Sequence, residues 1–142
     1  MPTRKASAVW EGGLQGGKGT FSGESGAIGG NYSFGSRFQN AAGSNPEELL
    51  AAAHAACFSM ALGAQLEKNG TPPARVETNA ACTVEKVGDG FKITTMKLTT
   101  RASVPNVDPS KFQELAAAAK DGCPVSQALK GNLKVELDAA LV

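Results

Sequence analysis

The amino-acid sequence predicts a single α+β domain built from antiparallel β-sheets and long helices. Residues 45–69 show a continuous apolar helical pattern between clear capping signals. The segments on either side alternate apolar and polar residues with the period of two that β-strands require. The 142 residues amount to one domain's worth of chain, and no repeat, low-complexity tract or linker divides them.

The first two predicted strands, residues 6–11 and 18–22, are joined by a glycine-rich stretch at residues 12–17. Glycines between two short strands are typical of a hairpin turn. A phosphate-binding loop would need a Lys-Ser/Thr signature and a helix directly after the glycines, and the sequence has neither. We therefore expect an antiparallel strand pair, followed by a loop over residues 23–30.

Residues 32–38 are predicted to form a third strand, because Tyr32, Phe34 and Phe38 alternate with small or polar residues. This pattern places Arg37 on the face opposite to the aromatic side chains. From the pattern alone, Arg37 either meets solvent, as most arginines do, or reaches a site on the far side of the strand.

The central helix has a well-defined start and end. Asn45 can cap its first turn, Pro46 suits the first helical position, and Glu48 stands three residues after the cap, as in a capping box. Glu47 is left free for another role. A basic residue followed by Asn-Gly and two nearby prolines predicts that the helix ends near Asn69.

Between residues 49 and 62 only His54 and Ser59 are polar, so the helix is apolar on every side. Such a helix is normally enclosed by other elements. Because one small domain has difficulty covering it, we expect a second subunit to contribute. An apolar stretch of fourteen residues is too short to cross a bilayer, so we predict no membrane span.

After the helix, residues 74–86 and 91–104 predict a long hairpin around residues 88–90. Cys82 lies mid-strand, where its expected role is that of a small buried hydrophobe. In the return strand the apolar positions switch from odd to even numbers, which predicts a bulge near residues 94–95.

Two further helices and a strand complete the chain. Residues 108–120 predict a helix that begins with an Asp-Pro pair and stops at Gly122. Pro124 then begins a short helix, which places Cys123 at a helix N-terminus. Alternating apolar residues over 133–139 predict the last strand.

Charge and cysteine content narrow the function classes. The 14 basic and 13 acidic residues form no run of one sign, which argues against nucleic acid or an anionic membrane as a partner. The N-terminus lacks the apolar core of a secretory signal, so we expect a cytoplasmic protein. Three cysteines in a reducing compartment indicate redox or nucleophilic chemistry more than structural disulfides.

Each helical cysteine could be functional or could simply be packing. Cys57 lies in the apolar centre of the long helix, and Cys123 lies at a helix N-terminus, where the dipole favours a thiolate. His54 stands three residues before Cys57, on the same helix face. It could activate Cys57 as a base, join the cysteines as a zinc ligand, or be a buried imidazole satisfied by the backbone. The zinc alternative is weak because the chain has no CxxC or HxxxH spacing.

Several motifs along the chain match a known family: Trp10-Glu11-Gly12, Gly17-Lys18-Gly19, Glu24-Ser25-Gly26, residues 32–38, Asn45-Pro46-Glu47-Glu48-Leu49, Ala53-His54-Ala55-Ala56-Cys57-Phe58-Ser59-Met60-Ala61-Leu62 and Gly122-Cys123-Pro124-Val125-Ser126. With these motifs the chain resembles the OsmC/Ohr hydroperoxide reductases, and their OsmC branch in particular. The resemblance runs nearly end to end. It implies a single OsmC-like domain over residues 1–142, with β-sheets around two long central helices in an intertwined homodimer.

The resemblance also implies a thiol-dependent peroxidase of oxidative or osmotic stress defence. In that family's terms Cys57 matches the peroxidatic cysteine, Cys123 the resolving cysteine, Arg37 the thiolate-pairing arginine and Glu47 its carboxylate partner. Cys57 would become a sulfenic acid, which Cys123 would convert to an intrachain disulfide before irreversible oxidation. The implied substrates are organic hydroperoxides and hydrogen peroxide, and the implied reductant is a dithiol or a lipoylated protein. No metal, haem or flavin is expected.

One geometric expectation follows from the residues themselves. Glu47 and Cys57 are ten residues apart, so on one straight helix they are separated by about 15 Å along the axis and lie on different faces. If both act in one site, Glu47 must come from the second subunit, together with Arg37. We therefore expect a composite active site.

Two other function classes compete with the peroxidase. A redox-sensing stress protein would use a switchable Cys57–Cys123 disulfide to change partner contacts, without turnover. A cysteine hydrolase would use His54 as its base, although the sequence shows no Asn/Asp motif to orient that base. The sequence does not indicate the preferred peroxide, the physiological reductant, the redox state of the cysteines, or whether Cys82 reacts and His54 tunes Cys57.

Overall fold

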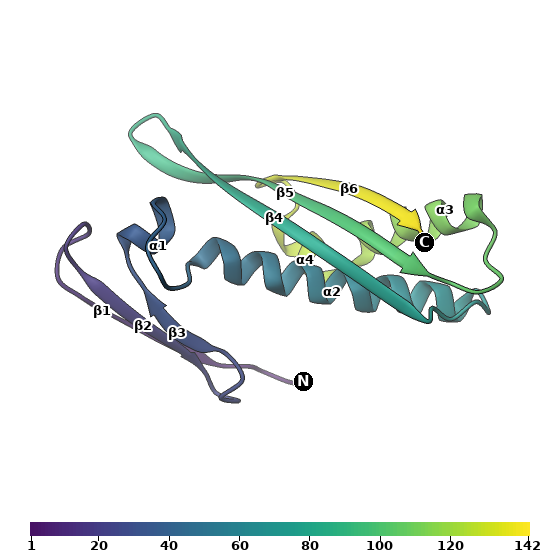
Figure 1. Ribbon diagram of the computed structural model, residues 1–142, viewed down its shortest axis with the longest axis horizontal. Coiled ribbons are helices and arrows are strands. Elements are labelled where there is room, and N and C mark those ends of the chain that lie inside the picture. The colour runs from purple at the N-terminus through teal and green to yellow at the C-terminus, as the bar shows by residue number, and fades with distance from the viewer. The chain divides into compact units, whose positions relative to one another are not determined.

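The structure is a computed structural model that describes all 142 residues. The chain divides into two compact units, Met1–Leu49 and Leu50–Val142. The elements in chain order (Figure 1) are β1 (Ala6–Glu11), β2 (Lys18–Gly23), β3 (Gly29–Tyr32), α1 (Phe34–Phe38), α2 (Pro46–Lys68), β4 (Arg75–Val87), β5 (Gly90–Ser103), α3 (Pro109–Gly122), α4 (Pro124–Leu129) and β6 (Lys134–Leu141). The helix α2 begins in the first unit and continues through the second.

The N-terminal unit contains an antiparallel sheet in the order β1-β2-β3. The glycine-rich turn between β1 and β2 is confirmed, and its geometry requires glycine: a Cβ added to Gly17 would lie 2.3 Å from the Gly13 carbonyl oxygen. Aromatic side chains pack on this sheet. The ring of Tyr32 lies 5.4 Å from that of Trp10 and 6.1 Å from that of Phe21.

The strand predicted over residues 32–38 is wrong. The strand β3 ends at Tyr32, and Phe34–Phe38 form the helix α1. The local reason is a reciprocal cap: Ser33 Oγ accepts from the Ser36 N–H at 3.0 Å, and Ser36 Oγ accepts from the Ser33 N–H at 2.8 Å. Phe34 and Phe38 also fit a helix, because residues four apart share a face, and their rings are 5.0 Å apart.

The predicted bounds of the central helix are confirmed. Asn45 Oδ1 accepts from the Glu48 N–H at 2.8 Å, as an N-cap does. The carboxylate of Glu48 accepts instead from the Ser44 hydroxyl, so the second half of the expected capping box does not form. After Lys68, Gly70 has a φ of 81°, the left-handed conformation that ends a helix.

The C-terminal unit contains the sheet β4-β5-β6. The strands β4 and β5 form the predicted hairpin, and the bulge is confirmed: Thr83 pairs with Thr95 and Val84 pairs with Ile93, leaving one extra residue in β5. The expectation of purely antiparallel sheets needs correction, because β6 runs parallel to β5. Parallel pairing needs a long crossover, and α3 and α4 supply it.

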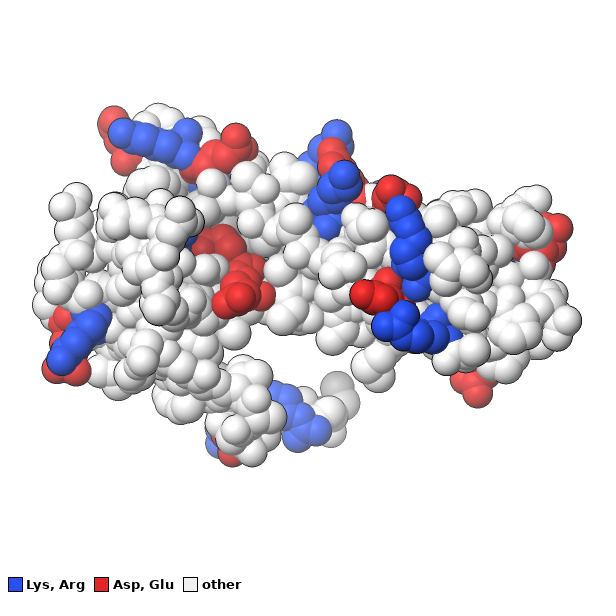
Figure 2. All heavy atoms as spheres, viewed as in Figure 1, with Lys and Arg blue, Asp and Glu red and all other residues white.

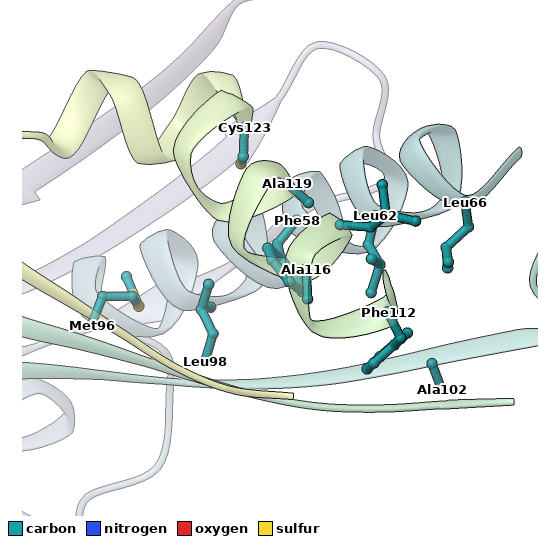
Figure 3. Close-up of a cluster of buried hydrophobic side chains, with 11 residues drawn as sticks. Phe58, Leu62, Leu66, Met96, Leu98, Ala102, Phe112, Ala116, Ala119 and Cys123 are labelled. Atoms are coloured by element: carbon teal, nitrogen blue, oxygen red, sulfur yellow. The ribbon is translucent and has the colours of Figure 1, made fainter. Parts of the chain in front are cut away.

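The core lies between α2, α3 and the inner face of this sheet (Figure 3). Its fully buried members from α2 and β5 are Phe58, Leu62, Leu66, Met96, Leu98 and Ala102, and α3 adds Phe112, Ala116 and Ala119. The opposite face of α2 is not covered by the other elements of the C-terminal unit, and Met60 on that face is 78% exposed. This unit by itself therefore encloses only one side of the apolar helix.

The helix α2 is also long and apolar enough, by length and composition, to cross a membrane. The apolar stretch over residues 49–62 is shorter than the helix itself, which has 23 residues, so the expectation that the helix is too short to cross a bilayer is wrong. The central helix of a soluble protein passes the same test, so this property is weak evidence for a membrane span. Charged side chains of both signs are spread over the face shown in Figure 2. Among the ion pairs of the chain, Arg75 pairs with Glu77 and Arg101 pairs with Asp138.

Candidate active site

Two cysteines that are 66 residues apart in the sequence meet in the C-terminal unit. Cys57 lies on α2, and Cys123 lies at the junction of α3 and α4. Their Sγ atoms are 3.0 Å apart and share a hydrogen bond, and both residues are free thiols. Cys123 is fully buried and Cys57 is half-buried. If one sulfur is oxidised, the other is already close enough to attack it.

The backbone around Cys123 is held by both helices that it joins. Its N–H donates to the Ala119 carbonyl of α3 at 2.9 Å, and its carbonyl accepts from the Gln127 N–H of α4 at 3.0 Å. Pro124 follows directly, and a residue before proline avoids the helical conformation, which agrees with the φ of −59° and ψ of 124° at Cys123. The thiol is therefore presented from a fixed turn and not from a mobile loop.

The two thiols differ in acidity. Burial raises the pKa of Cys57, and the hydrogen bond with Cys123 raises it further, while the Val125 N–H acts in the opposite direction. Burial also raises the pKa of Cys123, but hydrogen bonding to Cys57, to the N–H and hydroxyl of Ser126 and to the Val125 N–H outweighs burial, so the pKa of Cys123 is lowered. None of the influences on Cys57 is a positive charge, which is the kind of neighbour that would favour its thiolate.

The N-terminal unit contains an arginine of fixed orientation. Arg37 Nε donates to both Glu47 carboxylate oxygens, at 3.0 and 3.2 Å, and Arg37 Nη2 donates to Oε1 at 2.7 Å. The side chain of Glu47 is 7% exposed, whereas that of Arg37 is 36% exposed. The bidentate contact fixes the plane of the guanidinium and leaves Nη1 free of Glu47. The predicted association of Arg37 with Glu47 is thus present in the structure.

A cavity of about 290 Å³ in the same unit opens beside this arginine. Its lining combines the guanidinium with aromatic and apolar side chains: Trp10, Leu14, Tyr32, Ser33, Phe34, Arg37, Phe38 and Pro46. A cavity of this composition can accept a small apolar molecule that carries one polar end.

The four predicted site residues thus form two pairs. Arg37 and Glu47 pair in the N-terminal unit, and Cys57 and Cys123 pair in the C-terminal unit. That the two pairs act in one site remains a prediction. Cys82 lies in β4 and packs against the core, as expected of a small side chain.

His54 has a partner that the sequence reading missed. Its Nε2 lies 2.7 Å from Ser126 Oγ, and its Nδ1 is buried without a hydrogen-bond partner. Burial lowers the pKa of His54, so the ring is neutral near pH 7. The hydrogen-bond partner of His54 is thus the side chain of Ser126 and not the backbone. Separately, the structure contains no group of three or more His, Cys, Asp or Glu side chains that could hold a metal ion. The available signal was the position of Ser126 one helical turn after Cys123.

Comparison with known proteins gives a consistent result. A family described as OsmC-like protein matches residues 39–138. Peroxiredoxin OsmC of Escherichia coli is 46% identical over 134 residues, which is 94% of each chain. The organic hydroperoxide resistance protein OhrB of Bacillus subtilis is 37% identical over 97 residues, 68% of this chain and 69% of OhrB. The crystal structure of that OhrB matches with a TM-score of 0.75 and 29% identity, covering 96% of this chain and 98% of OhrB.

Proposed function

Because the chain belongs to the OsmC-like protein family, we propose that it is a cysteine peroxidase that reduces organic hydroperoxides and hydrogen peroxide. The observation that carries the proposal is the 3.0 Å separation of the Cys57 and Cys123 sulfurs. The similarity of this chain to proteins named peroxiredoxin and organic hydroperoxide resistance protein supports hydroperoxides as the substrate class.

The reaction has two balanced steps. The Cys57 thiolate attacks one peroxide oxygen, the O–O bond breaks, and the leaving alkoxide takes a proton to become an alcohol, or water when the substrate is hydrogen peroxide. Cys57 is thereby oxidised to a sulfenic acid. Cys123 then attacks the Cys57 sulfur, an S–S bond forms, and hydroxide leaves and is protonated to water. A dithiol or lipoylated protein reduces the disulfide and restores both thiols.

The cation for the first step is Arg37 in this proposal. Burial raises the pKa of Cys57, so its thiolate needs a nearby positive charge, and a guanidinium fixed by Glu47 is suited to supply one. Glu47 and Cys57 both lie on α2, ten residues and about 15 Å apart, so the arginine pair comes from the partner subunit. The aromatic cavity beside Arg37 would receive the organic part of the hydroperoxide.

The protein acts as a homodimer of one OsmC-like domain, residues 1–142, in which the uncovered face of α2 supports association with a second copy. It acts in the cytoplasm, in oxidative or osmotic stress defence, without metal, haem or flavin, and without binding nucleic acid or membrane.

Peroxide consumption with dithiothreitol as the reductant tests the proposal. We expect multiple turnovers per subunit for the unaltered protein, none for Cys57→Ser, and unchanged turnover for the matched control Cys82→Ser. Turnover that survives in Cys57→Ser would refute the assignment of the first sulfur. A protein that reacts about once per thiol pair and then stops would instead be the redox sensor that the sequence left as the alternative.

A further inference from the structure

A buried polar pair connects the two helices that carry the cysteines. His54 lies one turn before Cys57 on α2, and Ser126 lies one turn after Cys123 on α4. His54 Nε2 and Ser126 Oγ are 2.7 Å apart; His54 is fully buried, and Ser126 is nearly so. Buried polar groups cost free energy unless they are hydrogen-bonded, and neither residue has a part in the two steps above. Their place beside both thiols suggests a role in the chemistry.

The unpartnered nitrogen of His54 determines where the ring proton lies. Nδ1 is buried and has no partner. A proton on Nδ1 would create an orphaned N–H donor, which is rarer and more costly in a protein interior than an unused acceptor lone pair. The hydrogen-bond network therefore assigns the proton to Nε2, which donates to Ser126 Oγ.

This tautomer sets the direction of the Ser126 hydroxyl. A serine oxygen that accepts from His54 Nε2–H keeps its own O–H free to donate to another group. Cys123 is the N-cap residue of α4 and Ser126 is the third residue of that helix, two positions whose side chains are neighbours at a helix start, so the sulfur of Cys123 is the acceptor at hand. In agreement with this placement, the Ser126 hydroxyl is among the groups that lower the pKa of Cys123. His54 thus contacts Ser126, Ser126 stands one turn from Cys123, and Cys123 contacts Cys57 at 3.0 Å.

We propose that Ser126, oriented by His54, is a positioning residue for disulfide formation: its hydroxyl donates a hydrogen bond to the Cys123 thiolate as that thiolate attacks the oxidised sulfur of Cys57. The inference rests on the proposed peroxidase function and concerns only its second step. In that step the proton of Cys123 ends on the leaving hydroxide, so Cys57–SOH and Cys123–SH give the disulfide and water. His54 and Ser126 gain and lose no net proton.

The hydrogen bond from Ser126 would speed up disulfide formation. Once Cys57 is a sulfenic acid, a second peroxide molecule competes with Cys123 for it, and that second oxidation gives the irreversible sulfinic acid. A hydrogen bond to an ionised sulfur favours the thiolate, which is the attacking form. We therefore expect Ser126 and His54 to decide how much Cys57 escapes over-oxidation, and not how fast it reacts with the first peroxide.

Few other ionisable groups lie around the His54–Ser126 pair. Cys57 and His54 on α2 and Cys123 at the start of α4 are the titratable residues in the chain of contacts. On the α3 and α4 side, Ser126 lines a cavity of about 190 Å³ with the charged residues Lys120, Asp121 and Lys130. These three side chains are the same in the unaltered protein and in every variant below, so they do not distinguish one from another.

The test separates the two steps in one experiment. Reduced protein is mixed with an organic hydroperoxide, and quenched samples are analysed by mass spectrometry for Cys57 sulfenic acid, captured with dimedone, and for the disulfide. We expect Ser126→Ala to form sulfenic acid at the unaltered rate, to form the disulfide about tenfold more slowly, and to accumulate more sulfinic acid. His54→Gln, whose amide N–H can reach Ser126 as Nε2–H does, should recover most of the disulfide rate, whereas His54→Leu should not.

Ser59→Ala is the matched structural control. The Ser59 hydroxyl donates to Thr78 Oγ1 at 2.7 Å, the same length as the His54–Ser126 contact, but it lies outside the chain of contacts to Cys123. It should leave the ratio of disulfide to sulfinic acid unchanged. A Ser126→Ala protein that forms disulfide as fast as Ser59→Ala would overturn the inference.

A separate measurement covers the failure of the proposed function itself. If the unaltered protein forms no Cys57 sulfenic acid, the peroxidase proposal fails. The hydrogen bond to Cys123 is then tested by ultraviolet titration of the thiolate in a protein whose only cysteine is Cys123, made by Cys57→Ser and Cys82→Ser. Adding Ser126→Ala to that protein should raise the pKa of Cys123, and an unchanged titration would contradict the inference by itself.

Discussion

The ion pair between Arg37 and Glu47 gives a prediction whose size follows from the structure. In Glu47→Gln the carboxylate that accepts three N–H contacts from Arg37, between 2.7 and 3.2 Å, becomes an amide with one oxygen and no charge. Breaking a fully buried pair costs about 3–5 kcal/mol. Arg37 is 36% exposed, so solvent screens the pair and we expect about 1–3 kcal/mol of lost stability.

The same change should slow the first chemical step. Without Glu47 the guanidinium is no longer held in one plane, and we expect Cys57 to react with peroxide about tenfold more slowly in Glu47→Gln. Urea unfolding measures the first effect, and rapid mixing with an organic hydroperoxide measures the second. The control is Glu77→Gln, whose ion pair with Arg75 has 71% and 51% exposed side chains and should contribute less than about 1 kcal/mol. Equal stability and equal peroxide rates in the two variants would refute the reasoning.

Three further predictions follow from the thiols, the buried histidine and the uncovered helix face. Cys123→Ser should still react once with peroxide but lose activity progressively with dithiothreitol, because Cys57 accumulates as sulfinic acid visible by mass spectrometry; full and lasting turnover would contradict its resolving role. Burial lowers the pKa of His54, so the histidine binds a proton more readily in the unfolded chain than in the folded one. The stability of the folded protein that depends on neutral His54 is therefore complete above about pH 6.5 and falls as the pH drops below it. Thermal unfolding of His54→Gln at several pH values should lack this part of the pH dependence. Met60→Glu, on the exposed face of α2, should weaken the dimer in sedimentation experiments, whereas Val87→Glu at the hairpin tip should not, and an equally strong dimer in both would exclude this face as the interface.

The sequence predicted those features that depend on local signals. The central helix is bounded by an N-cap at Asn45 and a left-handed Gly70, both of which are chemical requirements visible in the sequence. The bulge in β5 was visible as a change in the phase of its apolar residues. In each case a few neighbouring residues determine the outcome.

The wrong predictions arose where both the strand repeat and the helix repeat fit the same residues, or where the structure depends on distant parts of the chain. Phe34 and Phe38 are four apart, which suits one face of a strand or of a helix, and the Ser33–Ser36 cap decided for the helix. The direction of β6 depends on the path of the α3–α4 crossover, which no pattern within β6 encodes.

The candidate site shows the same division. The chemistry of the individual residues, two cysteines and an arginine, was apparent from the sequence and from the family resemblance. From the residues alone the proximity of the two cysteines was not apparent, because the spacing of Cys57 and Cys123 along the chain carries no information on distance in the fold; it was expected only from the family resemblance. The contact of His54 with Ser126 was missed for the same reason, since it joins residues 72 positions apart.

Mass spectrometry of the reduced protein, after it reacts with one equivalent of organic hydroperoxide, shows directly whether the two sulfurs act as a redox pair. We expect an intrachain Cys57–Cys123 disulfide, formed through a Cys57 sulfenic acid and reversed by dithiothreitol, with Cys82 unmodified. A stable disulfide that involves Cys82, or peroxide consumed with both Cys57 and Cys123 still reduced, would contradict this expectation.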